Sequence, residues 1–139
     1  MNTLAEFLFA APARRTTPAI ISWWERRRPA YNLWVGAAGL VSLVSVGTAT
    51  ALMGGAVHIR EGLLAAAIFG GMANICYFFG PATELLLEKV WGRRALPAGP
   101  MLFRMGLTFS VGLALLPTLI TMFLMTLRVV LAVFGISLV

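Results

Sequence analysis

Three long uncharged segments dominate the pattern of hydrophobic and polar positions along the chain. They cover about residues 33–57, 62–83 and 105–127. A helix rises about 1.5 Å per residue, so each segment is long enough to cross a hydrocarbon layer of about 30 Å. The pattern therefore predicts an all-α integral membrane protein with three transmembrane helices.

The residues before the first uncharged segment follow a different pattern. Short apolar groups alternate there with arginines, and Thr17-Pro18 is typical of a helix start, whereas Pro29 predicts a break. We expect residues 1–30 to form an interfacial amphipathic arm, followed by a transmembrane helical bundle over residues 31–139. The predicted membrane-surface anchor is Trp23, Trp24, Arg26, Arg27 and Arg28, which suit the headgroup level and an anionic cytoplasmic leaflet. The alternative is that the arm docks on a partner or a specific lipid.

A stripe of small and polar residues follows the second uncharged segment and continues to Trp91. If residues 62–91 form one helix, the members of the stripe fall within about 120° of arc. The stripe consists of Gly62, Ala66, Gly70, Asn74, Tyr77, Pro81, Glu84 and Glu88. Asn74 lies near the middle of the span, where an unpaired amide is costly, so this face is expected to contact protein. We interpret the stripe as a packing seam; the alternative is an ion or proton path through Asn74, Tyr77 and Glu84.

The first uncharged segment has small residues on two faces. One face carries Asn32, Gly36, Gly39, Gly47, Thr50 and Gly54, and the other carries Ala38, Ser42, Ser45 and Ala49. Helices in lipid associate by close approach over small residues and by hydroxyl hydrogen bonds. We therefore expect this helix to pack on both sides, once within the chain and once against another copy or another protein.

The third uncharged segment contains Pro117, which is expected to kink it. The tail over residues 129–139 is apolar but too short to span a membrane alone. It either extends the third helix or shifts that helix so that Arg128 lies deeper.

Composition supports the bilayer as the solvent. The chain is 60% hydrophobic and only 12% charged, so a soluble fold of this size would expose a large apolar surface. The net charge of +6 does not indicate nucleic acid, because the basic residues flank the apolar segments as orientation signals do. The expected partners are the lipid bilayer and other membrane subunits or copies of this chain.

The distribution of basic residues predicts the orientation. Five arginines precede the first span, one lies in the first loop, four basic residues separate the second and third spans, and one follows the third. By the positive-inside rule the N-terminus is cytoplasmic and the C-terminus lies on the opposite side. The same topology predicts that Glu84 or Glu88 pairs with Arg104, and that Glu61 pairs with Arg128.

Residues suited to catalysis are scarce. The chain has one histidine (His58), one cysteine (Cys76) and no aspartate, so no set of two histidines or of several cysteines is available for a metal or haem. We therefore expect no catalytic, metal or cofactor-binding residues, and no enzymatic activity.

Two blocks, YNLWVG at residues 31–36 and ANICYFFGPATEL at residues 73–85, resemble segments of small uncharacterised bacterial multi-pass membrane proteins. The resemblance implies a bacterial inner membrane and carries no function with it. The favoured hypothesis is a non-catalytic structural or accessory subunit of a larger membrane complex. The alternative is a homo-oligomeric channel or small transporter that uses the Asn74–Tyr77–Glu84 face.

Overall fold

The computed structural model describes residues 3–11, 16–91 and 98–135, and every regular element within these ranges is a helix. The helices are α1 (Thr3–Phe9), α2 (Thr17–Leu52), α3 (Ile59–Tyr77), α4 (Phe79–Trp91) and α5 (Gly99–Val133). Both α2 and α5 carry a proline in the first turn, where its missing N–H has no helical partner to lose. The predicted all-α fold class is confirmed.

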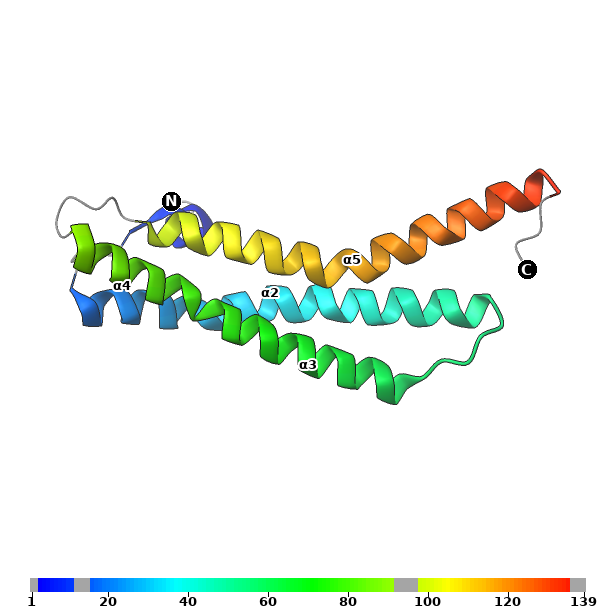
Figure 1. Ribbon diagram of the computed structural model, residues 1–139, viewed down its shortest axis with the longest axis horizontal. Helices are drawn as coiled ribbons and strands as arrows, with labels where there is room; N and C mark the ends of the chain where they lie inside the picture. The colour runs from blue at the N-terminus through cyan, green and yellow to red at the C-terminus, as the bar shows by residue number, and fades with distance from the viewer. Residues whose placement is uncertain (1–2, 12–15, 92–97, 136–139) are drawn as a thin grey trace.

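Three stretches are long and apolar enough to cross a membrane: α2, α3 together with α4, and α5. They run side by side along the long axis of the molecule, with the N-terminus at one end and the C-terminus at the other (Figure 1). Most of the large hydrophobic side chains on their outer faces are exposed. The helices are longer than the predicted spans because they include polar ends beyond each uncharged segment.

Helix α2 continues through Pro29, where the sequence predicted a break between an arm and the bundle. The residues on both sides of the proline pack into the same core: Trp24 and Arg27 before it and Tyr31 and Val35 after it are buried. Tertiary packing therefore outweighs the loss of one helical hydrogen bond at Pro29. The stretch from Thr17 to Pro29 is therefore continuous with the rest of α2 and packs against the bundle.

Residues 62–91 do not form the single helix that the sequence predicted, because the chain breaks at Phe78 between α3 and α4. Pro81 has no N–H to donate to the carbonyl of Tyr77, and the Phe78 N–H turns to Ile75, three residues back, at 3.1 Å. The break is local, and α4 continues in nearly the same direction as α3 (Figure 1).

Helix α5 bends near its middle (Figure 1), and Pro117 lies midway along it. The predicted kink has the expected cause, since a proline inside a helix leaves the carbonyl four residues earlier without its partner. The helix continues past Arg128 to Val133, so the first part of the tail extends it. Residues 136–139 lie outside the described part of the chain.

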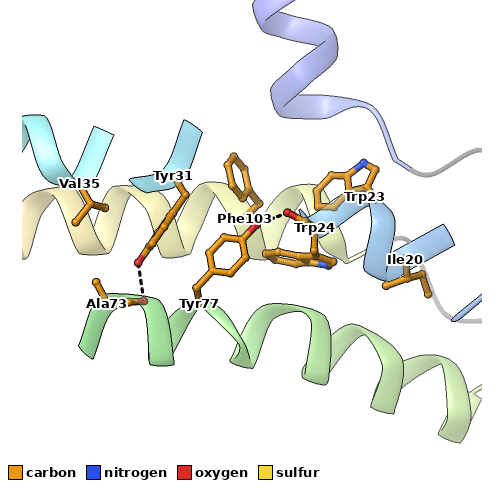
Figure 2. Packing of buried hydrophobic residues seen from close by; sticks show 8 residues of the cluster. All are labelled: Ile20, Trp23, Trp24, Tyr31, Val35, Ala73, Tyr77 and Phe103. Atoms are coloured by element: carbon orange, nitrogen blue, oxygen red, sulfur yellow. Dashed lines mark hydrogen bonds between the residues drawn. The ribbon is translucent and has the colours of Figure 1, made fainter. Parts of the chain in front are cut away.

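The buried core lies toward the end of the bundle that holds α1 and α4. It consists of Ile20, Trp23, Trp24, Tyr31, Val35, Ala73, Tyr77 and Phe103 (Figure 2). Its aromatic rings meet edge to face, with the Trp24 centroid 5.5 Å from Tyr77 and 6.1 Å from Phe103. This cluster joins α2 to both of its neighbours, α3 and α5.

Candidate functional site

The members of the stripe on α3 and α4 all lie on the protected side of these helices. Tyr77 and Glu84 are buried, and the others are half-buried: Gly62, Ala66, Gly70, Asn74, Pro81 and Glu88. The break at Phe78 divides the stripe into two environments. Its C-terminal part packs into and beside the aromatic core, whereas its glycine-rich part borders an open groove.

Glu84 is the most deeply buried charged residue among those described, at 1% exposure. Its Oε2 atom accepts a hydrogen bond of 2.7 Å from Nε1 of Trp24, and no described residue bonds to its Oε1 atom. A Cβ atom added at Gly99 would lie 2.6 Å from Oε2. Since α5 begins at Gly99, the carboxyl group lies against the end of that helix where negative side chains are favoured. Glu84 thus joins α4 to α2 and to the start of α5.

Two tyrosine hydroxyls form hydrogen bonds that join α2 to α3. Tyr77 donates to the carbonyl of Trp24 at 2.6 Å, and Tyr31 donates to the carbonyl of Ala73 at 3.1 Å (Figure 2). The Tyr31 hydroxyl also lies 2.7 Å from Oγ of Ser110 on α5. These bonds satisfy polar groups inside an apolar bundle, where an unpaired hydroxyl would be costly.

One small-residue face of α2 packs within the chain. Ala38, Ser42 and Ala49 are buried. Ser42 donates to the carbonyl of Ala114 at 2.5 Å, and its Oγ lies 2.9 Å from the hydroxyl oxygen of Thr118. These contacts join α2 to α5 beside the proline of that helix.

The other small-residue face of α2 borders a groove of about 320 Å³ between α2 and α3. The polar groups of the groove are Asn32 and Asn74, and Asn74 uses its Nδ2 atom on the carbonyl of Gly70 at 3.0 Å. The glycines that line it are Gly36, Gly39 and Gly70, and a Cβ atom added at any of them would meet no atom within 4 Å. Close packing inside the chain therefore does not require glycine at these positions.

The residues of the predicted ion path do not share one surface. Asn74 lines the groove between α2 and α3, whereas Tyr77 lines a separate hollow of about 270 Å³ beside α5. Glu84 is enclosed by Trp24 and Gly99. Within this chain alone, each of the three residues has its own surroundings.

Neither expected ion pair is present among the described residues, where the arginine–glutamate pair is Glu25–Arg28 at 2.9 Å and Oε2 of Glu61 lies 3.9 Å from Nδ1 of His58. Arg104 instead donates to the carbonyl of Pro100 at 3.2 Å. Glu88 forms no ion pair with any described residue, and the C-terminal half of α5, to which Arg128 belongs, bends away from α2 and α3 (Figure 1). The prediction from topology alone did not include the nearer partners of Arg104 and Glu61, which are the carbonyl of Pro100 and the side chain of His58.

The side chains of the expected surface anchor are partly buried and partly exposed in the structure. Trp23, Trp24 and Arg27 are at most 7% exposed and contact protein, whereas Arg26 is exposed and Arg28 lies 4.5 Å from the Phe78 ring centre. A signal for this was present in the sequence, since the buried positions of α2 recur at a spacing of three or four residues on both sides of Pro29. They are Ile20, Trp23, Trp24, Arg27, Tyr31 and Val35.

Within the described ranges, no three side chains of histidine, cysteine, aspartate or glutamate come close enough together to hold a metal ion. Cys76 is exposed on α3. Comparison with protein-family models, curated proteins and solved structures finds no match to this chain.

Proposed function

We propose that this protein is a non-catalytic structural or accessory subunit of a larger integral membrane complex. In this proposal α2, α3 with α4, and α5 each cross the membrane. The exposed apolar side chains along all three stretches support a lipid environment.

The proposed location is the bacterial inner membrane, with a cytoplasmic N-terminus and the C-terminus on the opposite side. The end of the bundle that holds α1 and α4 carries Arg26, Arg27, Arg28, Lys89 and Arg104. The other end carries Arg60 and Arg128. This asymmetry supports the orientation by the positive-inside rule. Arg14, Arg15, Arg93 and Arg94 belong to the same argument and lie outside the described residues.

The groove between α2 and α3 carries the proposal. Its glycines leave the backbone accessible, and no atom of this chain fills the space where their side chains would lie. In lipid, such small-residue surfaces let another helix approach closely, and an amide such as that of Asn74 can hydrogen-bond to it. The partner is another subunit or a second copy of this chain.

Purification in mild detergent, followed by mass measurement, tests the proposal. We expect stable co-purification with other membrane chains. A symmetric ring of this chain alone would instead support the alternative of a homo-oligomeric channel or small transporter. In that case, ion flux in liposomes that is unchanged by Asn74→Leu would exclude the Asn74–Tyr77–Glu84 face as the path.

Gly70→Leu provides the matched structural test. We expect the variant to fold, because a Cβ atom at Gly70 meets nothing within 4 Å, and to lose most of the associated chains, because the leucine fills the groove. Gly112→Leu is the control, since Gly112 on α5 also has open space around it and does not line this groove. Equal retention of partners by the two variants would show that the groove is not the contact surface.

A further inference from the structure

Arg27 is a buried cation whose hydrogen-bond partners, within the part of the chain that the structure describes, are all carbonyl oxygens. The residue is 7% exposed. Its Nε and Nη2 atoms both donate to the carbonyl of Phe7, at 2.9 and 2.6 Å, and Nη1 donates to the carbonyl of Trp23 at 3.3 Å. The guanidinium carbon lies 3.7 Å from the centre of the Trp23 ring. The side chain is therefore held firmly in one orientation.

No carboxylate neutralises this charge. The chain has no aspartate, and its five acidic residues are all glutamates that lie within the described ranges. Among the described residues the arginine–glutamate pair within 4.0 Å is Glu25–Arg28, so no glutamate lies that close to Arg27. Burying a cation without an anion is costly, so an incoming anion would gain more at this position than at an exposed arginine.

A second arginine contacts the same short helix through a different ring. The guanidinium carbon of Arg104 on α5 lies 4.3 Å from the centre of the Phe9 ring, and that of Arg27 lies 4.8 Å from the Phe7 ring. Helix α1 is thus contacted by two cations through its rings and one carbonyl. A helix of seven residues has little stability of its own, so α1 depends on these contacts for its position.

We propose that Arg27 forms a binding site for a phosphate group, that of an anionic lipid headgroup or a free phosphate, and that α1 covers this site. Two parallel N–H groups of Arg27 converge on the single carbonyl oxygen of Phe7, which is the side-on arrangement that binds a phosphate oxygen. While α1 is docked, the carbonyl oxygen of Phe7 occupies the position that one phosphate oxygen would take. When α1 lifts, the guanidinium group of Arg27 faces an anion instead of the Phe7 carbonyl.

Lipid retention by the full-length protein tests the site. The protein is placed in nanodiscs of phosphatidylcholine with increasing phosphatidylglycerol, and the retained lipids are counted by native mass spectrometry. We expect wild-type protein to retain phosphatidylglycerol selectively, and Arg27→Gln to lower its affinity about tenfold, as for the loss of one charge-assisted hydrogen-bonded contact. Equal retention of the two lipids by the wild-type protein would overturn the proposal.

Arg26→Gln is the matched control. Arg26 is exposed, precedes Arg27 directly and bonds within its own helix to Ser22, so both substitutions remove one charge from the same turn. General attraction to an anionic surface predicts the same loss for both variants. A defined site predicts a loss for Arg27→Gln alone, and equal losses would contradict it. Arg27→Lys serves as the second variant if Arg27→Gln does not fold: it keeps the charge but loses the pair of parallel N–H groups, and it is expected to lower the affinity as well.

If α1 covers the site, a substitution that weakens the docking of α1 is expected to raise the affinity for phosphatidylglycerol, whereas Arg27→Gln lowers it. Phe7→Ala removes the ring that meets Phe103 at 6.0 Å and so weakens docking of α1 without touching either arginine's charge. We expect this variant to bind phosphatidylglycerol more tightly than the wild-type protein. An unchanged or lower affinity would show that α1 does not compete with the lipid.

Inorganic phosphate at millimolar concentration distinguishes the two sources of the ligand. Displacement of retained phosphatidylglycerol by phosphate would assign the site to phosphate groups in general. Retention in the presence of phosphate would assign it to the lipid headgroup.

Discussion

Glu84→Ala is expected to lower the free energy of unfolding by about 3 kcal/mol, because it leaves the buried indole N–H of Trp24 without its acceptor and opens a cavity beside α5. The carboxyl group joins three elements, so its removal is expected to loosen the end of the bundle that holds α4. Unfolding of the purified protein, followed by circular dichroism in detergent, measures the change.

Glu84→Gln separates the hydrogen bond from the charge. The amide oxygen of glutamine can still accept from Trp24, whereas the charge beside the N-terminus of α5 is lost. We expect the glutamine variant to retain most of the stability that the alanine variant loses. Equal losses for both would mean that the charge, and not the hydrogen bond, is what stabilises this junction.

A double-mutant cycle isolates the Trp24–Glu84 pair. Trp24→Phe keeps an aromatic ring in the core but removes the only donor that the described residues offer to Glu84. If the bond contributes as a typical hydrogen bond to a charged group does, the coupling energy is about 1.5–3 kcal/mol. Additive effects of the two substitutions would contradict the assignment.

Gly80→Ala is the second substitution with a large expected effect. A Cβ atom at this position would lie 2.3 Å from Cη2 and 2.5 Å from Cζ3 of the Trp24 ring. The ring cannot move aside easily, because its nitrogen is bonded to Glu84 and its faces and edges meet Trp23, Tyr77 and Phe103. We expect a loss of about 3 kcal/mol, at the upper end of the range for overpacking a core.

Gly71→Ala is the control for Gly80→Ala. Gly71 lies in the same membrane-length stretch, and a Cβ atom there meets nothing within 4 Å. Alanine in place of glycine within a helix is favourable by about 0.5–1 kcal/mol, so this variant is expected to be as stable as the wild-type protein or slightly more so. Similar losses for the two variants would show that close contact with Trp24 does not limit the residue at position 80.

The two glycines differ in a way that the sequence does not reveal. Gly71 follows Gly70 and Gly80 follows Phe79 in the same apolar stretch, and either glycine could serve packing, bending or close approach. The difference depends on Trp24, which lies more than fifty residues earlier in the chain. Similarly, nothing near Glu84 in the sequence indicated that its partner is an indole nitrogen and not an arginine.

The predicted break at Pro29 is a second case in which contacts between distant elements, and not the local sequence, decided the structure. Pro29 and the tryptophan–arginine run are typical of an interfacial segment, and a local interpretation favours a break. The buried side chains on both sides of the proline lie on one face of a continuous helix. The apolar periodicity across Pro29 was visible in the sequence, but the proline outweighed it in the prediction.

The sequence by itself determined the all-α class, the three apolar stretches of membrane length and the kink at Pro117, because helix length, hydropathy and the missing proline N–H are local properties. Only the tertiary structure decided which small-residue face of α2 is filled and which is open, since that depends on the path of α3 and α5. It also decided that Glu84 bonds to Trp24 and that Arg27 and Arg104 each contact a ring of α1. Such partners are set by the distances between elements far apart in the chain, and no local pattern encodes those distances.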